Sequence, residues 1–296
     1  MKVLHIAVFD NLAISADTSA AQALIRHTDV EDLMGYNYRP RAQAIGFEAR
    51  DDELIQICKE QKPDLVLFVK CNHMNTRVFK ECKKVCSIAY WFPDPLVTFR
   101  EDPEYMEKAK VSDLVFVDKK NVFDEIKPHN TNTFIIPDGF DASVEQPQDE
   151  IAVDIDVSFI GQLYGERATK IQQIKHPISI ISNAYGRTHS EAVSRSKINL
   201  NFCTSDGPSN RIYKIIAAKG FLLTDDWVDR DKEFEDGKHL VIFKDIDDLN
   251  KKIAYYLENE EERNQIREEG YNLSHKYSRD IWAEKLILHY QQLKEQ

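Results

Sequence analysis

The sequence predicts an α/β protein of two domains, each with a parallel β-sheet, and three observations support this. Short apolar runs alternate with amphipathic stretches along the whole chain, which is typical of βαβ units. Some runs, such as residues 65–69, are continuously apolar, as strands covered on both faces are. Residues 141–154 are acidic, carry a proline and lack a strong period, so they are predicted to link the two halves.

The first domain is predicted to span residues 1–141. Its expected strands are residues 2–9, 33–38, 64–69, 86–92, 113–118 and 133–137. Its expected helices are residues 19–26, 51–60, 76–84, 101–110 and 121–126. No GxGxxG motif follows the first strand, so the dinucleotide-binding fingerprint is absent.

Residues 31–41 are ambiguous, because the expected strand ends among aromatic and basic side chains. Tyr36, Tyr38, Arg39 and Arg41 can stack on and pair with an acceptor or a nucleic acid strand. A solvated strand end is the alternative, and it is the favoured one. Both interpretations stay open at this point.

The second domain is predicted to span residues 155–278. Its expected strands are residues 155–160, 178–181, 198–202, 221–224 and 239–243. Its expected helices are residues 166–174, 190–196, 209–219, 247–259 and 261–273. A last helix, residues 279–296, alternates Trp282, Leu286, Ile287 and Tyr290 with charged residues, so it needs a surface to cover.

Composition excludes several classes of protein. The 296 residues are 42% apolar, enough for a core in each domain, and no run is long enough to span a membrane, so we expect a cytoplasmic protein. The net charge of −11 disfavours a broad nucleic acid interface. The five cysteines are irregularly spaced and include no CxxC pair, so neither a disulfide framework nor a metal site is expected.

Residues 199–226 indicate a strand, a turn, a helix and a second strand. Ser209 is a candidate N-cap, and Gly220 supplies a helix stop. The helix N-terminus presents unpaired N–H groups, and Arg211 adds a positive charge one turn into the helix. The segment therefore predicts an anion site, with an ordinary crossover and a solvated Arg211 as the alternative.

Six segments, in this order along the chain, carry a resemblance to a known family: residues 64–69, 90–95, 136–141, 156–161, 211–224 and 234–243. In these segments the chain resembles the glycosyltransferases of the GT-B fold, in particular the CgeB-like branch of the glycosyl transferases group 1 class. The resemblance implies two Rossmann-like domains facing across a cleft. It assigns the donor to the second domain and the acceptor to the first, and it brings the final helix back onto the first.

The resemblance implies transfer of a sugar from a nucleoside diphosphate sugar, with a UDP-sugar expected, to an acceptor hydroxyl. It implies no metal and no cofactor beyond this co-substrate, and retention of configuration. Helix N-termini and basic side chains then have to stabilise the leaving diphosphate. The donor-binding candidates are Gly161, Arg167, Asp206, Ser209, Asn210, Arg211, Lys214 and Asp225.

The first domain supplies the other candidates. Asp94 stands in a proline-flanked loop after a strand, where it either contacts the sugar or acts as the base for the acceptor hydroxyl. His73 is the alternative catalytic residue. The acceptor-binding candidates are Asp10, Asn11, Tyr38 and Arg39. A structural Asp in a proline turn and an uninvolved loop histidine are the competing interpretations.

One departure from the family leaves other functions open. Many relatives carry two glutamates at the helix that Arg211 begins, one of which binds ribose, but Gly207 and Lys214 stand at the corresponding positions. Lys214 can hold a phosphate instead, with Asp206 or Asp225 serving the ribose. The alternatives are a nucleotide-sugar epimerase or hydrolase and an inactive nucleotide-binding relative. A nucleic acid with hydroxymethylated bases is possible as acceptor but is not favoured by the charge.

Overall fold

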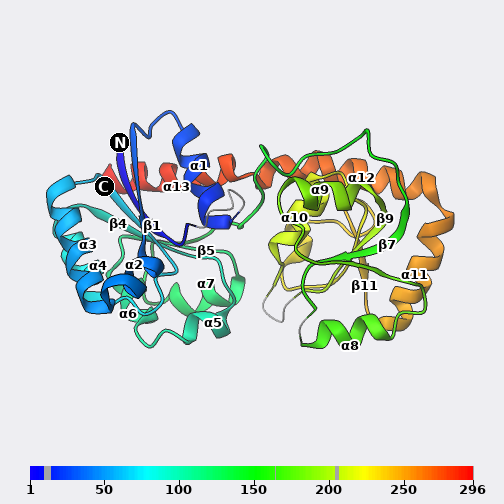
Figure 1. The fold of residues 1–296 in the computed structure, drawn as a ribbon, viewed down its shortest axis with the longest axis horizontal. Helices are drawn as coiled ribbons and strands as arrows, with labels where there is room; N and C mark the ends of the chain where they lie inside the picture. The colour runs from blue at the N-terminus through cyan, green and yellow to red at the C-terminus, as the bar shows by residue number, and fades with distance from the viewer. Residues whose placement is uncertain (10–14, 164, 204–206, 296) are drawn as a thin grey trace. The chain divides into compact units, whose positions relative to one another are not determined.

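The computed structural model describes residues 1–9, 15–163, 165–203 and 207–295. The chain forms two compact units. Unit 1 comprises Met1–Asp138 and Arg279–Gln296, and unit 2 comprises Gly139–Ser278. Each unit contains one parallel sheet with helices on both faces (Figure 1). The predicted α/β class with two parallel sheets is therefore confirmed.

Within the described residues, six parallel strands form the sheet of unit 1, in the order β2-β1-β3-β4-β5-β6. The strands are β1 (Lys2–Ala7), β2 (Asp32–Asn37), β3 (Leu65–Val69), β4 (Ser87–Phe92), β5 (Leu114–Val117) and β6 (Thr133–Ile135). The chain places β2 on one side of β1 and β3 on the other, so the order in which strands are added reverses between β1 and β3. In open parallel sheets, the carboxyl ends of the strands at such a point form a crevice that binds ligands.

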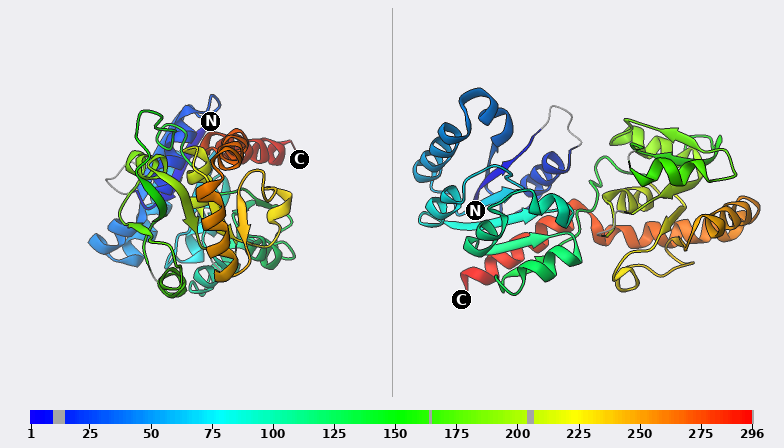
Figure 2. Two further views of the ribbon diagram at one scale, coloured as in Figure 1. Left: turned by 90° about the vertical axis from the view of Figure 1, so that its right-hand side faces the viewer. Right: turned by 90° about the horizontal axis from the view of Figure 1, so that it is seen from below.

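Two layers of helices cover the sheet of unit 1. One face packs against α1 (Ala16–Arg26) and α13 (Arg279–Lys294), and the indole rings of Trp91 and Trp282 lie 4.6 Å apart there. The other face carries α2 (Tyr38–Ile45), α3 (Phe47–Gln61), α4 (Thr76–Lys83), α6 (Tyr105–Val111) and α7 (Lys120–Ile126). Figure 2 (right) shows α13 and α3 on opposite sides of these strands. The apolar stripe of the last helix thus covers unit 1.

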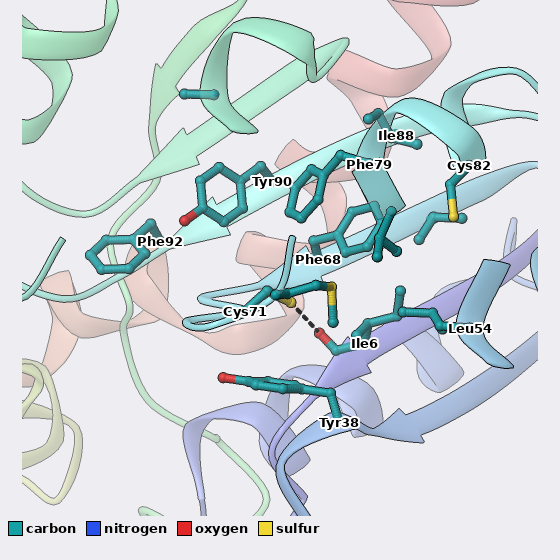
Figure 3. Close-up of a cluster of buried hydrophobic side chains, with 14 of the residues drawn as sticks. Ile6, Tyr38, Leu54, Phe68, Cys71, Phe79, Cys82, Ile88, Tyr90 and Phe92 are labelled. Atoms are coloured by element: carbon teal, nitrogen blue, oxygen red, sulfur yellow. Dashed lines mark hydrogen bonds between the residues drawn. The ribbon is translucent and has the colours of Figure 1, made fainter. Parts of the chain in front are cut away.

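The core beneath α3 and α4 is built from continuously buried strand residues. Phe68 and Phe79 stack with ring centroids 3.8 Å apart, and Phe79 meets Tyr90 edge to face (Figure 3). Tyr38 lies at the border of this cluster, and its hydroxyl points away from Leu54. The cluster fixes the positions of the loops that leave β1 and β3.

Unit 2 repeats the plan with the sheet order β11-β10-β9-β7-β8 over the described residues. Its strands are β7 (Ile155–Ile160), β8 (Ser179–Ile181), β9 (Ser196–Asn201), β10 (Leu222–Asp225) and β11 (Val241–Phe243). One face packs against α9 (Arg187–Ser194) and α10 (Asn210–Ala217), and the other against α8 (Glu166–Gln172) and α11 (Ile246–Glu258). Helix α12 (Glu260–Ser274) packs on α10 and α11. The order of the strands reverses between β7 and β9.

Two helices of unit 1 were not expected from the sequence. Helix α5 (Leu96–Arg100) lies in the segment after Pro95, and α2 begins at Tyr38, where the sequence indicated a strand end. Pro40 is the third residue of α2. Its missing N–H is no loss there, because the first-turn N–H groups of a helix have no partner within the helix. Tyr38 and Arg39 are therefore helical residues.

The end of α10 differs from the predicted glycine stop. Lys219 adopts the left-handed conformation with φ +58°, and Gly220 follows it. The N–H of Gly220 donates to the carbonyl of Ile215 and that of Lys219 to Ile216, which is a Schellman motif. Gly220 is required for a different reason, because a Cβ there would lie 2.4 Å from Cγ1 of Val193.

The predicted linker, residues 141–154, lies within unit 2. Glu145 is buried in this segment, and its Oε1 lies 2.9 Å from Nζ of Lys214 on α10. The same carboxylate accepts a hydrogen bond from the N–H of Asp141. The segment is therefore anchored on α10.

None of the helices formed by the described residues combines the length and apolarity that a membrane crossing requires.

Candidate functional site

Polar side chains gather at the carboxyl ends of β7 and β9, where the strand order of unit 2 reverses. Gly161 follows β7 directly, with φ +147°. A Cβ at this residue would lie only 2.4 Å from Nη2 of Arg211, so the guanidinium occupies the space that any other side chain would need. The structure thus brings together Gly161 and Arg211, which the sequence predicted separately.

Asn201, the last residue of β9, holds Arg211 in place. Its Oδ1 accepts a hydrogen bond of 2.9 Å from Nη1 of Arg211 and one of 3.0 Å from Oγ of Ser209. The guanidinium also lies over the ring of Phe159, 4.9 Å from its centroid. A planar cation fixed in this way is suited to bidentate contact with a phosphate.

Ser209 occupies the N-cap position of α10, but its side chain makes no capping hydrogen bond. The predicted N-cap position is therefore confirmed, but the hydroxyl donates to Asn201 instead of accepting from a helix N–H. The first N–H groups of α10 are consequently not satisfied by this side chain. Together with Arg211, they form a cationic end to the helix at the reversal of the sheet.

Three further polar residues surround the end of β9. The guanidinium of Arg167 is buried, and its Nη2 donates to the carbonyl of Phe202 over 3.3 Å. Asp225 ends β10, and its carboxylate accepts hydrogen bonds from the N–H of Cys203 at 2.6 Å and from Nζ of Lys170 at 3.4 Å. Arg167 and Asp225 are thus both placed at this edge, each with a backbone partner.

Lys214 lies one turn further along α10, and its ammonium is paired with Glu145. Its exposed fraction is 21%, against 3% for the Glu145 side chain. His189 is buried nearby on α9, with no hydrogen-bond partner for either ring nitrogen. Burial lowers the pKa of His189 to about 3, and Lys214 and Arg211 add to this effect. The imidazole is therefore neutral beside these two cations at physiological pH.

In unit 1, Asp94 lies beyond the end of β4 and pairs with Lys70. Its Oδ2 is 2.9 Å from Nζ of Lys70, and both side chains are partly exposed. Burial lowers the pKa of Lys70, but the neighbouring carboxylates, Asp94 foremost, outweigh burial and leave this pKa raised. Asp17 lies nearby and accepts a hydrogen bond from the N–H of Val8. Burial raises the pKa of Asp17, against the lowering effect of Lys70.

The loop after β3 has an unusual backbone. Lys70, Cys71 and His73 all have left-handed φ values, between +52° and +61°, which side chains other than glycine rarely adopt. Such strain persists only where the surroundings impose it, and it is concentrated at functional sites. The strained loop presents Lys70 to Asp94 and His73 to a pocket.

Tyr38, Arg39 and His73, predicted apart, line one pocket of about 330 Å³. The predicted catalytic residues Asp94 and His73 both belong to unit 1. All the described donor-binding candidates belong to unit 2. Asp10, Asn11 and Asp206 lie outside the described residues. In the described ranges no three His, Cys, Asp or Glu side chains gather where they could hold a metal ion.

Sequence reasoning missed Asn201 and Lys70. Asn201 ends a buried strand that also carries Asn199, and two amides in such a strand are a usable signal, because buried amides need partners. Lys70 directly follows the apolar run 65–69, at the edge of the sheet where ligands bind. Its pairing with Asp94 depends on the order of the strands, which the sequence does not display.

Comparisons with known proteins give a family match over part of the chain and a shared fold. Residues 148–286 match the sequence model of a family described as glycosyl transferase-like. No curated protein matches the chain.

Three solved structures among the matches align with almost the whole chain. HepE of Anabaena, solved in complex with UDP and glucose, has a TM-score of 0.70 and 10% sequence identity over 99% of both chains. Sucrose-phosphate synthase of Thermosynechococcus elongatus has a TM-score of 0.72 and 10% identity, again over 99% of both chains. A third structure, a glycosyltransferase from Rickettsia africae, has a TM-score of 0.66 at 9% identity and covers 99% of this chain and 98% of its own.

Proposed function

We propose that the chain is a glycosyltransferase that transfers a sugar from a UDP-sugar to an acceptor hydroxyl, supported by the shared fold and by the family match of residues 148–286. Unit 2 binds the donor, and unit 1 binds the acceptor. UDP is the expected nucleotide because HepE, which shares the fold, was solved with UDP and with UDP-glucose.

The observation that carries this proposal is the arrangement of Gly161, Asn201 and Arg211 at the reversal of the second sheet. The absence of a side chain at Gly161 leaves room beside the backbone for the Arg211 guanidinium, which can meet a diphosphate there. Arg211, fixed by Asn201, supplies two parallel N–H donors and a full charge. The N-terminus of α10 adds backbone N–H groups and a partial positive charge.

These groups act on the leaving diphosphate. When the bond between the anomeric carbon and the diphosphate oxygen breaks, negative charge grows on that oxygen. Donors fixed in advance stabilise this charge more in the transition state than in the ground state, because they need no reorganisation. Arg211 is the principal donor in this account. Arg167 supports the edge of β9 next to it.

Unit 1 supplies Asp94 for the acceptor side. Lys70 holds the Asp94 carboxylate in position at the carboxyl edge of the sheet. Asp94 then either contacts a sugar hydroxyl or takes the proton of the acceptor hydroxyl as the new glycosidic bond forms. His73 is the second candidate for the proton. We include retention of configuration and independence from metal ions in the proposal, as the family resemblance implies.

Lys214 is the residue that favours a second candidate, an inactive nucleotide-binding relative. The lysine stands where many relatives carry a glutamate, and its ammonium pairs with Glu145. Among the described residues, Asp225 can take the place of the missing glutamate, because its carboxylate lies at the end of β10, at the same edge of the sheet. A nucleotide-sugar epimerase or hydrolase on the same fold is the other alternative, and it differs by needing no acceptor.

A nucleotide panel tests the proposal. The melting temperature of the full chain is measured with UDP, GDP, ADP and dTDP, since a ligand that binds only the folded state raises it. UDP is expected to give the largest shift. Release of UDP from UDP-sugars is then measured with and without saccharide acceptors. Turnover only with an acceptor supports transfer, turnover without one supports the epimerase or hydrolase, and nucleotide binding without any turnover supports the inactive relative. No shift with any nucleotide would overturn the proposal.

A further inference from the structure

We propose that the acceptor is a saccharide carrying an anionic group, bound by unit 1 in the pocket formed by Tyr38, Arg39, Phe47, Arg50, Asn72 and His73. This inference rests on the proposed function, because it names the chemical class of the acceptor.

The pocket lies where the first sheet favours a ligand. Tyr38 and Arg39 directly follow β2, and Asn72 and His73 follow β3. These strands flank β1, next to the reversal of the strand order, and their carboxyl ends border the crevice that open parallel sheets offer to ligands. The volume of about 330 Å³ is in the range of small-molecule sites.

Two residues that line the pocket each carry a buried polar atom without a hydrogen-bond partner among the described residues. Tyr38 is only 2% exposed, yet its hydroxyl is unpaired, and Oδ1 of Asn72 is also buried and unpaired. Burial raises the pKa of Tyr38, so its hydroxyl remains a donor at neutral pH. The Arg39 guanidinium lies close enough to oppose that rise but forms no hydrogen bond of acceptable geometry with the hydroxyl.

In the proposed complex, these atoms pair with hydroxyls of the ligand. One hydroxyl accepts from the Tyr38 hydroxyl, and one donates to Oδ1 of Asn72. Buried polar groups in folded proteins are nearly always paired, so two unpaired atoms on residues that line one cavity call for a partner, which a ligand can supply. A saccharide carries several such hydroxyls on one ring, which makes it the class that fits this part of the pocket.

The positive charge of the pocket indicates which kind of saccharide it binds. Its lining includes two guanidiniums, Arg39 and Arg50, and no carboxylate among the residues that the structure describes. Arg50 is held by Asp51, with Nε and Oδ1 2.8 Å apart, and its Nη2 donates to the carbonyl of His73. Arg39 is exposed, and no carboxylate in the described ranges pairs with it. In a chain of net charge −11, such a pocket favours an anionic substituent on the ligand.

A neighbouring pocket gives the contrast. It has a volume of about 490 Å³ and shares Phe47 and His73 with the first, but carboxylates such as Asp52 and Glu104 line it. The two pockets therefore differ in the sign of their charge across a common wall. An anionic group on the ligand is therefore expected to bind in the pocket that contains Arg39.

The common wall is aromatic. The ring of Phe47 is 59% exposed, and the ring of His73 lies 6.2 Å from it. Arg50 lies behind Phe47, 5.4 Å from its centroid, which fixes the ring position. An exposed aromatic face of this kind stacks on the C–H face of a pyranose. The left-handed backbone at His73 holds its ring in this wall.

The test is a titration of the full chain, saturated with UDP, with methyl glucuronide, methyl glucoside and inorganic phosphate. The two sugars differ in the carboxylate, and phosphate lacks the ring. Methyl glucuronide is expected to bind at least tenfold more tightly than either of the others. Equal affinity for the two sugars would contradict the proposed anionic group on the acceptor. An affinity for phosphate equal to that for methyl glucuronide would contradict the proposed saccharide. Tighter binding of a short oligonucleotide would also overturn it.

Variants place the binding in this pocket. Arg39→Gln should weaken methyl glucuronide about tenfold and leave methyl glucoside unchanged, whereas Tyr38→Phe should weaken both sugars. Arg41→Gln is the matched control, because Arg41 is exposed on the same helix and paired with Glu53, with Nη2 and Oε2 2.6 Å apart. Unchanged binding in Arg39→Gln and Tyr38→Phe, or equal loss in Arg41→Gln, would overturn the inference.

The UDP affinity of each variant separates this inference from the proposed function. UDP binding without saccharide binding contradicts the pocket and leaves the transferase standing. Saccharide binding without UDP binding contradicts the donor site and leaves the pocket standing.

Discussion

Gly161 and Arg211 are close enough that one residue determines what the other can do. A methyl group at Gly161 would meet Nη2 of Arg211 at 2.4 Å, and its φ of +147° is unfavourable for alanine. The guanidinium would have to leave Asn201. The binding of a diphosphate therefore depends on the absence of a side chain at Gly161.

Gly161→Ala is expected to lower the affinity for UDP about tenfold and the free energy of unfolding by about 1–3 kcal/mol. Both quantities are measured, by calorimetric titration and by urea unfolding. Gly237→Ala is the control, because Gly237 also has a positive φ, +75°, but has nothing within 4 Å of its Cβ position. It should lose stability and keep its UDP affinity. Equal UDP affinity in the two variants would show that Arg211 tolerates the displacement.

Asp94 and Lys70 form the second pair whose function depends on both members. Asp94→Asn keeps the size of the side chain but removes the charge that Lys70 holds in place. Turnover should fall about 100-fold or more, as expected for the loss of a general base, with UDP affinity unchanged. Asp124→Asn, in an exposed pair with Lys120, should keep full turnover. Full turnover in Asp94→Asn would remove Asp94 from the chemistry.

Many of the residues of the site can be predicted from the sequence, but the contacts between them cannot. Gly161 and Arg211 are recognisable from a glycine after a strand and an arginine at a helix N-terminus. Their contact is not, because it depends on β7 and β9 being neighbours while β8 lies on the far side. Asn201 was missed for a different reason, because its partner Arg211 lies ten residues further along the chain, on the next helix.

At the scale of elements, α10 carries the site and is fixed at its far end by Lys219 and Gly220. A Cβ at Gly220 would lie 2.4 Å from Cγ1 of Val193 on α9. Lys219 instead bears the left-handed conformation that glycine adopts without cost. Substitutions at Lys219 and Gly220 are therefore expected to change the free energy of unfolding in opposite directions.

Gly220→Ala should lower the free energy of unfolding by about 1–3 kcal/mol, as overpacking does. Lys219→Gly should raise it by up to about 1 kcal/mol, because relief of the left-handed strain exceeds the loss of a largely exposed ion pair with Glu268. Urea unfolding measures both. Destabilisation by Lys219→Gly comparable to that of Gly220→Ala would contradict the assignment of strain to Lys219.

The pattern of elements was the most predictable level, because alternating strands and helices follow from periodicity alone. Helices α2 and α5 are exceptions, and α2 shows the reason. Its sequence is short and polar, with Pro40 inside it, so no apolar period marks it, and its two buried residues are Tyr38 and Ala42. Its position is fixed by packing on α3, a tertiary effect that a local pattern does not contain.

At the scale of the molecule, the chain passes from unit 1 to unit 2 and back, and one ion pair joins the two crossing points. Asp138 is the last residue of the first pass, Arg279 begins the second, and the two side chains form a buried salt bridge. Nε of Arg279 also donates to Oγ of Ser19 on α1, over 3.0 Å. The beginning of α13 is thereby fixed to unit 1.

Each unit also buries one neutral histidine, which makes stability depend on pH. Burial lowers the pKa of His5 in unit 1 and of His189 in unit 2 to about 3. Between their unfolded pKa of about 6.5 and about 3, the unfolded chain binds more protons than the folded chain, so acid favours unfolding. The stabilisation is complete above about pH 6.5 and is lost as the pH falls.

His5→Leu should therefore reduce the slope of unfolding free energy against pH between about 6.5 and 5 by up to about 1.4 kcal/mol per pH unit in unit 1. Urea unfolding at several pH values, followed by a probe in each unit, measures this. His129→Gln, at an exposed position, should leave the slope unchanged. An unchanged slope in His5→Leu would contradict a neutral buried His5.

The central claim is that a nucleoside diphosphate is bound by Arg211 at the reversal of the second sheet, and calorimetric titration of UDP into the full chain, Arg211→Ala and Arg195→Ala tests it most directly. Arg195 is exposed and pairs with Asp154, just before β7 begins, at the opposite edge of the same sheet. The unsubstituted chain and Arg195→Ala should bind UDP equally, and Arg211→Ala about 10- to 100-fold more weakly, as the loss of a charged hydrogen bond predicts. Equal affinity in all three proteins, or no binding of UDP by any of them, would contradict the account.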